Sequence, residues 1–209
     1  YRDSYSSFSI TPQRERKLVC RYRTGRGNPL MVFKEEVEWD EPMILRYHDF
    51  LSEGEIDTIK TLARPKVHAT WHVTVLFISL SAWLSEDEDP VISQLNQRIA
   101  GVSGLELETA EELQIANYGI GGQYEPHYDS KLRGGRIATV LIYMSDVDIG
   151  GATVFPDVGA ALQPKRGTAV LWFNLLRNGS EDARTLHAAC PVFVGSKWGK
   201  CSVRLVLSK

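Results

Sequence analysis

The second half of the chain, beyond Gly104, consists almost entirely of short β-prone segments that glycine and proline separate from one another. Short strands divided by turn residues are typical of sandwiches, barrels and jelly rolls. The predicted strands in this half span residues 113–118, 137–144, 152–155, 169–175, 188–194 and 201–207. The pattern therefore predicts a sheet fold of the barrel or jelly-roll kind.

Two amphipathic helices are predicted before this region. The first begins at Ser52, which is placed to form a capping box with Glu55, and it ends before Pro65. Its apolar face is formed by Ile56, Ile59, Leu62 and Ala63. The second begins at Pro90 and is expected to end before Gly101. Its apolar face is formed by Val91, Ile92, Leu95 and Ile99.

Strand patterns also occupy residues 32–50 and 72–84. Two helices followed by a series of short strands predict an α+β domain with both helices packed on a sheet. Residues 1–30 are rich in Ser, Arg and Gly without sustained periodicity, and we expect them to form a lead-in or linker. The folded domain is expected to span residues 31–209.

The composition excludes several classes of protein. A length of 209 residues, with 43% hydrophobic and 24% charged residues, fits one globular domain. The net charge of −2 gives no sign of nucleic-acid or membrane-surface binding, and no apolar run is long enough to span a bilayer. The chain opens at Tyr1 with neither Met nor a signal-peptide pattern, so we expect it to be a piece of a longer protein.

The three cysteines, Cys20, Cys190 and Cys201, have neither CxxC nor zinc-site spacing. Two interpretations are open: Cys190 and Cys201 pair in an oxidising compartment, or the thiols are free and buried. Residues 178–180, Asn-Gly-Ser, form an N-glycosylation sequon, a triplet that is common by chance.

The stretch NYGIGGQYEPHYD, from Asn117 to Asp129, carries a His-x-Asp pair, His127 and Asp129, after a Gly-rich bend. Strand neighbours two residues apart point to the same face, so we expect this imidazole and carboxylate to converge. A second imidazole, His187, follows 58 positions beyond Asp129 (187 − 129). Two histidines and one carboxylate form the facial triad of non-haem Fe(II) oxygenases. Lys197, ten positions further on (197 − 187), is a cation suited to a carboxylate-bearing co-substrate.

The alternative interpretation is that this spacing arose by chance, because a single histidine is more often a packed or surface residue than a ligand. His48, His68 and His72 have no comparable partners in the sequence and are expected to be such residues. Trp172 and Trp198 are expected to lie in the core.

Four ordered motifs point to a known family: NYGIGGQYEPHYD, RIATVLIYMSDVDIGGATVFPDVGA, PKRGTAVLWFNL and TLHAACPVFVGSKW. Together they resemble the catalytic domain of the collagen prolyl 4-hydroxylase α subunit, over roughly residues 10–198. The resemblance implies a double-stranded β-helix (jelly-roll) core. It also implies a dioxygenase that uses Fe(II), 2-oxoglutarate and L-ascorbate to hydroxylate C4 of proline in procollagen-like X-Pro-Gly sequences. The family's animal members reside in the endoplasmic reticulum lumen as α2β2 tetramers, with protein disulfide isomerase as the β subunit.

Residue by residue, the resemblance implies that His127, Asp129 and His187 hold the iron. It implies that Lys197 pairs with the C5 carboxylate of 2-oxoglutarate in a charge-assisted contact. Four further positions match family residues that surround the co-substrate and the peptide: Tyr118, Thr153, Tyr124 and Arg136.

Within this second set, Tyr118 and Thr153 match hydroxyls that assist the C5 carboxylate. Tyr124 matches a tyrosine that faces the iron and the substrate, and Arg136 matches an arginine near the peptide groove. The structural alternatives are that both tyrosines are packing aromatics and that Thr153 is an ordinary strand hydroxyl.

The chain also departs from the family pattern in three places. Residues 68–83 are short and apolar where the family has a polar hairpin, only SKLRGG separates Asp129 from Arg136, and the chain ends in GKCSVRLVLSK. Two alternatives to collagen hydroxylation therefore stay open. One is a prolyl hydroxylase with a different protein target, and the other is a non-catalytic variant that keeps the fold and the assembly role.

Overall fold

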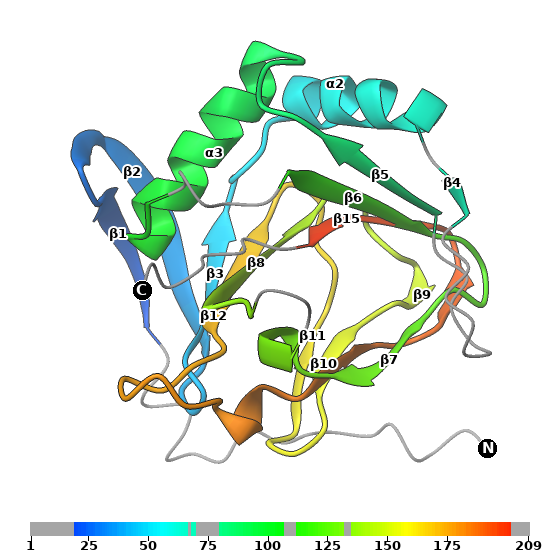
Figure 1. Ribbon diagram of the computed structural model, residues 1–209. Coiled ribbons are helices and arrows are strands. Elements are labelled where there is room, and N and C mark those ends of the chain that lie inside the picture. The colour runs from blue at the N-terminus through cyan, green and yellow to red at the C-terminus, as the bar shows by residue number, and fades with distance from the viewer. Residues whose placement is uncertain (1–18, 67, 70–79, 107–111, 132–134, 202–209) are drawn as a thin grey trace.

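The computed structural model describes residues 19–66, 68–69, 80–106, 112–131 and 135–201, and its core is a double-stranded β-helix (Figure 1). Within the described residues, nine strands form a large antiparallel sheet. In spatial order they are β1 (Cys20–Gly25), β2 (Asn28–Trp39), β3 (Ile44–His48), β12 (Ala169–Phe173), β8 (Ala138–Tyr143), β15 (Lys197–Cys201), β6 (Leu113–Tyr118), β5 (Leu80–Leu84) and β4 (His68–Ala69).

A smaller antiparallel sheet packs against the large one and closes the barrel (Figure 1). Its described strands, in spatial order, are β11 (Ala160–Leu162), β10 (Thr153–Phe155), β13 (His187–Ala189) and β7 (Tyr124–His127). A two-stranded ladder joins β9 (Ile149–Gly150) to β14 (Val192–Val194). Three single turns of 3-10 helix are η1 (Arg64–Lys66), η2 (Asp129–Lys131) and η3 (Ala183–Thr185).

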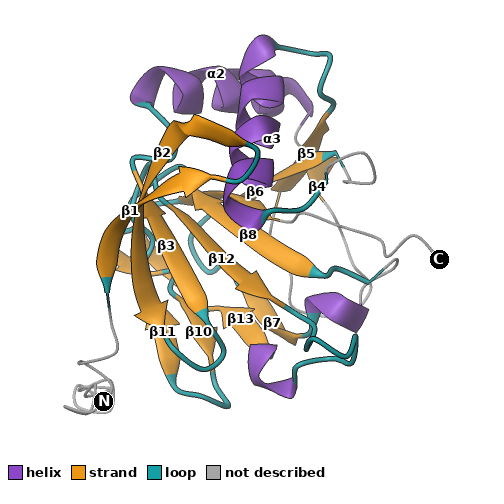
Figure 2. Ribbon diagram, turned by 90° about the vertical axis from the view of Figure 1, so that its left-hand side faces the viewer, coloured by secondary structure: helices purple, strands orange, loops and turns teal. Residues whose placement is uncertain are grey.

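The helices α2 (Glu53–Ala63) and α3 (Pro90–Ser103) lie together on the outer side of the large sheet (Figure 2). The capping box predicted for the first helix is present, with Ser52 and Glu55 each bonding the other's backbone N–H. Its buried residues, Ile56, Ile59 and Ala63, belong to the face that the sequence predicted. Among the described residues, no helix is long and apolar enough to cross a membrane.

The two central strands of the large sheet are buried on both faces. On β12, Leu171 packs toward the helices, whereas Val170 and Trp172 pack toward the small sheet. On β8, Val140 packs toward the helices and Tyr143 toward the small sheet. This double burial explains why both strands read as continuous apolar runs rather than alternating ones. Because of it, side chains of β8 and β12 also fill the space between the two sheets.

Several sequence-based boundaries were wrong. Gly101 lies inside α3, which ends at Gly104 in a left-handed conformation (φ 71°). Close packing explains why a glycine occupies this position inside the helix, because a Cβ at Gly101 would lie 3.3 Å from the ring of Phe33. The segment expected to be a lead-in contains β1, which pairs with β2 from Cys20 onward.

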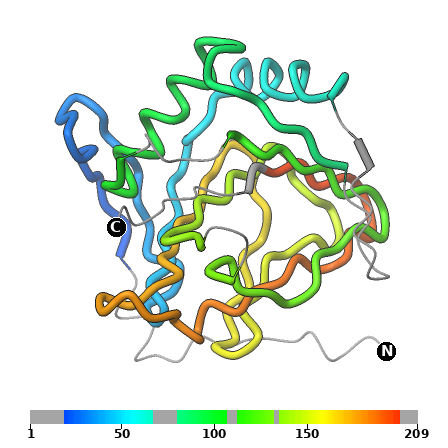
Figure 3. The backbone as a smooth tube through the Cα atoms, in the orientation of Figure 1, coloured from blue at the N-terminus to red at the C-terminus, as the bar shows by residue number. Residues whose placement is uncertain are grey.

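Other predicted strands differ in extent. Residues 32–50 form two strands, β2 and β3, and residues 188–194 divide between β13 and β14 at Pro191, which has no N–H to donate. The last described strand, β15, begins at Lys197 and runs beside β6, as the red and green segments of Figure 3 show. Residues 72–79 and 202–207 of the predicted strands lie outside the described residues.

Candidate metal centre

His127, Asp129 and His187 come together at one end of the small sheet, with one potential ligand atom from each within 4.8 Å of the others. His127 is the last residue of β7 and His187 the first residue of β13, and the two are paired in the ladder. The expectation that Asp129 would share a strand face with His127 was wrong. Asp129 opens η2, so the chain leaves the strand and turns its carboxylate back toward the imidazoles.

Backbone carbonyls fix the proton position on both imidazoles. His127 Nδ1 lies 2.7 Å from Glu125 O, and His187 Nδ1 lies 2.9 Å from Thr185 O. A carbonyl only accepts, so each Nδ1 carries the proton and each Nε2 presents its lone pair. Those two Nε2 atoms lie 3.7 Å from Asp129, one facing Oδ1 and the other Oδ2. This tautomer is the one that ligating histidines adopt.

The electrostatics of the site favour neutral imidazoles beside an ionised carboxylate. Burial, together with the neighbouring His187, lowers the pKa of His127 to about 4. Burial also lowers the pKa of His187. For Asp129, burial alone would raise the pKa, but His187, Arg136 and Thr139 outweigh it and hold the pKa below its usual value. Two neutral nitrogens and one anionic oxygen are a donor set that fits Fe(II).

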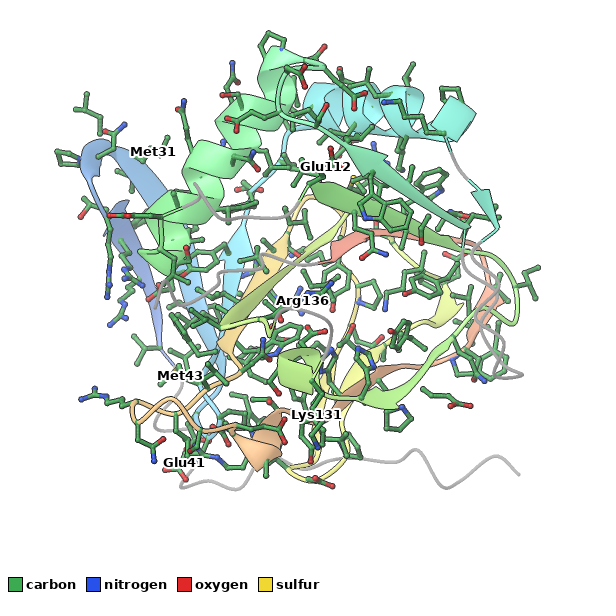
Figure 4. All side chains as sticks on the ribbon, viewed as in Figure 1. Met31, Glu41, Met43, Glu112, Lys131 and Arg136 are labelled. Atoms are coloured by element: carbon green, nitrogen blue, oxygen red, sulfur yellow. The ribbon has the colours of Figure 1, made fainter. Side chains whose placement is uncertain are left out.

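The carboxylate of Asp129 is fully buried and bonded at both oxygens. Arg136 Nη1 donates to Oδ1 at 2.7 Å, and Thr139 Oγ1 donates to Oδ2 at 2.6 Å. Arg136 lies toward the centre of the barrel in Figure 4. The side chain that the sequence placed near a peptide groove is thus bound directly to the metal-site carboxylate.

A second buried polar cluster surrounds Lys197, the first residue of β15. Lys197 is 2% exposed. Its Nζ donates to Thr153 Oγ1 at 3.3 Å, and Tyr143 OH donates to the same atom at 2.9 Å. The Nζ lies 5.8 Å from the ring centroid of Tyr118 and 5.6 Å from that of Tyr143. Lys197 also acts on His187, since its charge helps to depress the pKa of that histidine.

Tyr143 was missed by the sequence reading. It lies in β8, a strand that the sequence predicted. The two-residue period of that strand is the signal that would have identified it. Positions 139, 141 and 143 share one face, so a tyrosine at 143 points to the same side as Thr139.

The remaining predicted residues are placed as follows. The ring of Tyr124 packs against that of His127, with centroids 3.9 Å apart and an interplanar angle of 55°. Trp172 is confirmed as core, and Trp198 packs against the core on the helix side. His48, partly exposed, forms a hydrogen bond of 2.6 Å with Glu36. The side chain of His68 and all of His72 lie outside the described residues, and Cys20 and Cys190 are free thiols.

Comparison with known proteins agrees with this geometry. Residues 113–207 match the model of the 2OG-Fe(II) oxygenase superfamily. The chain is 53% identical to prolyl 4-hydroxylase subunit alpha-2 of Gallus gallus in an alignment of length 210, gaps included, that covers 90% of this chain and 39% of that protein. The chain carries His127, Asp129, His187 and Lys197 within the residues that match this model. It is also 50% identical to human prolyl 4-hydroxylase subunit alpha-1 in an alignment of length 215, gaps included, that covers 90% of this chain and 40% of that protein.

The chain thus spans about two fifths of the length of these curated relatives. Among solved structures, it is similar to the viral collagen prolyl hydroxylase of Paramecium bursaria Chlorella virus-1 in its 2OG complex. That match has a TM-score of 0.67 and 25% identity, over 78% of this chain and 96% of the viral one. A prolyl hydroxylase of Trichoplax adhaerens shares the fold, with a TM-score of 0.58 and 17% identity over 78% of this chain and 83% of that one.

Proposed function

We propose that this chain is the catalytic region of a procollagen-type prolyl 4-hydroxylase. It hydroxylates peptidyl proline to 4-hydroxyproline in X-Pro-Gly sequences and depends on Fe(II) and 2-oxoglutarate. The observation that carries the proposal is the His127–Asp129–His187 donor set, in which Asp129 and His187 are buried, together with the buried ammonium of Lys197 that donates to Thr153. The names of the relatives, prolyl 4-hydroxylase α subunits, support this choice within the superfamily.

His127, Asp129 and His187 would hold the iron, which supplies the oxygen-activating and C–H-oxidising chemistry when it is bound. The protein's own residues prepare the site. The backbone carbonyls beside the two histidines keep each Nε2 deprotonated, and the buried carboxylate stays ionised. Asp129 and His187 are buried between the two sheets, which keeps water from that side of the centre.

Lys197 and Thr153 would receive the C5 carboxylate of 2-oxoglutarate. Thr153 Oγ1 accepts hydrogen bonds from both Lys197 and Tyr143, so its own proton is not used by either contact. A hydroxyl proton beside a buried ammonium suits a carboxylate, because charge-assisted hydrogen bonds are strongest where water is excluded. Tyr118, directly paired with Lys197 in the ladder, would line the same subsite.

Tyr124 and Arg136 would act on the peptide side of the centre. Tyr124 is partly exposed and packs against His127, which supports a position between the iron and the incoming proline. The bond from Arg136 to Asp129 supports a role in orienting that ligand, beside the proposed role near the peptide groove.

The setting of the enzyme is part of the proposal. Relatives named as α subunits support assembly with a protein disulfide isomerase β subunit in an α2β2 tetramer, residence in the endoplasmic reticulum lumen, and ascorbate as reductant. Asn178 of the sequon is exposed in the turn after β12, where a glycan would meet solvent.

The test is 2-oxoglutarate decarboxylation with Fe(II) and ascorbate, with and without a (Pro-Pro-Gly)n peptide, together with the peptide's mass. Peptide-stimulated decarboxylation and a mass gain of one oxygen per hydroxylated proline are expected. Decarboxylation that this peptide never stimulates would instead indicate a different protein target. Metal binding without any decarboxylation would indicate the non-catalytic variant.

A further inference from the structure

A chain of three buried hydrogen bonds joins the carboxylate of Asp129 to the indole of Trp172. Trp172 Nε1 donates to Asn174 Oδ1 at 2.9 Å, and Asn174 Nδ2 donates to Thr139 Oγ1 at 2.9 Å. Thr139 Oγ1 in turn donates to Asp129 Oδ2 at 2.6 Å. None of the four residues is more than 1% exposed.

Chemistry fixes the direction of every bond in this chain. An indole N–H only donates and an ionised carboxylate only accepts. Asn174 must therefore turn its Oδ1 toward Trp172 and its Nδ2 toward Thr139, and the one hydroxyl proton of Thr139 is committed to Asp129. The backbone of Asn174 is held as well, because its N–H and its C=O form hydrogen bonds of 2.8 and 2.9 Å.

The same indole also contacts a second potential ligand. The ring of Trp172 meets that of His187 edge-on, with centroids 5.0 Å apart and an interplanar angle of 69°. Phe155 packs against both rings, 5.2 Å from Trp172 and 5.6 Å from His187. Trp172 is thus linked to Asp129 through its N–H and to His187 through its ring.

The chain of hydrogen bonds starts from two neighbouring strands of the large sheet. Thr139 on β8 and Trp172 on β12 are direct cross-strand partners in the middle of the large sheet. The three potential ligands come instead from β7, η2 and β13, on the small sheet and its turn. The central strands are therefore placed to set the orientation of side chains that the opposite sheet supplies.

We propose that Trp172, Asn174 and Thr139 form a positioning relay that holds the Asp129 carboxylate and the His187 ring in the orientation that binds metal. None of the three touches the reacting atoms, so each acts through a ligand. The inference rests on the metal site of the proposed function. Loss of an outer partner of a ligand commonly weakens metal binding about 10–100-fold, and the relay is expected to show a loss in that range.

The experiment measures the Co(II) dissociation constant of the metal-free protein by titration, together with the visible absorption of bound Co(II). Thr139→Val removes the hydroxyl at nearly constant shape, Thr139→Ser retains it, and Trp172→Phe keeps an aromatic ring against His187 but removes the N–H. The matched control is Thr168→Val, because Thr168 is also buried and hydrogen-bonded but its hydroxyl bonds Arg46 and Lys165 instead.

The relay predicts that Thr139→Val raises the Co(II) dissociation constant about 10–100-fold and changes the visible spectrum. Thr139→Ser should recover most of the affinity, Trp172→Phe should lose part of it, and Thr168→Val should bind as the unsubstituted protein does. An unchanged dissociation constant in both Thr139→Val and Trp172→Phe would overturn the relay while leaving the metal site intact. An equal loss in Thr168→Val would also overturn it, by showing a general effect of stability.

If Thr139→Val does not fold, Trp172→Phe decides the question with the same titration. Failure of the unsubstituted protein to bind Co(II) has a different meaning, because it would remove the metal site of the proposed function and the relay with it.

Discussion

His127 and His187 are cross-strand partners in the β7–β13 ladder, and their ring centroids lie 4.3 Å apart. Facing side chains in an antiparallel pair are held at close range by the ladder itself. A slip of one residue in the register would turn one imidazole to the other face of the sheet. The spacing of the two imidazoles is therefore a property of strand pairing, and the third member of the set depends on the turn that follows β7.

Replacing Asp129 tests the donor set. Asp129→Ala is expected to abolish Fe(II)-dependent turnover and Co(II) binding, because it removes the only carboxylate among the three groups. Asp129→Asn keeps the shape of the side chain but not its charge. Its metal affinity should fall by more than about 100-fold, the largest loss that is usual when a residue that only hydrogen-bonds a ligand is removed. Succinate formation and Co(II) titration measure both effects, with exposed Asp157→Ala as the control. Hydroxylation that survived Asp129→Ala would refute the assignment.

Replacing Lys197 tests the co-substrate subsite. Lys197→Ala removes a buried ammonium, and loss of one partner of a buried charge pair weakens binding about 30-fold or more. The expected result is a higher KM for 2-oxoglutarate. Initial rates over a range of 2-oxoglutarate concentrations give the KM, and exposed Lys165→Ala is the control. An unchanged KM would remove Lys197 from this role.

Replacing Arg136 distinguishes two roles for that side chain. If its bond to Asp129 Oδ1 orients the ligand, Arg136→Met should raise the Co(II) dissociation constant about 10-fold or more. If Arg136 acts mainly in a peptide groove, the KM for (Pro-Pro-Gly)n should rise and metal affinity should stay the same. Measuring both constants on one protein preparation separates the two outcomes, and we expect the first.

Glu55 is expected to make stability depend on pH. Burial alone would raise its pKa, but hydrogen bonds from Arg98 and Ser52 outweigh burial and bring the pKa to about 2, from an ordinary value of 4.5. Because the folded-state value is the lower one, the stabilisation is present above pH 4.5 and is lost as the pH falls toward 2.

The corresponding variant is Glu55→Gln, which should lower the free energy of unfolding at pH 7 by about 1 kcal/mol, the usual value of a helix cap. The difference from the unsubstituted protein should shrink as the pH falls from 4.5 toward 2. Urea unfolding at several pH values measures it, with exposed Glu86→Gln as the control. A difference that stayed constant over this range would contradict the role of the Glu55 charge.

Local features were predictable because few residues decide them. Ser52 and Glu55 predict the start of α2, since a capping box needs only two side chains at fixed spacing. The strand at residues 113–118 was predicted with its observed boundaries. Gly101 misled the prediction because its place inside α3 depends on Phe33 of a distant strand, and no local pattern carries that contact.

The sequence by itself determined which residues are candidates for the site, because residue types and ordered motifs point to His127, Asp129, His187 and Lys197 without any coordinates. Only the tertiary structure decided how these groups are held. The pairing of β7 with β13 sets the distance between the imidazoles, and the η2 turn brings in the carboxylate. The last hydrogen bond of the relay, from Thr139 on the large sheet to Asp129 beside the small one, forms only once the two sheets have packed against each other.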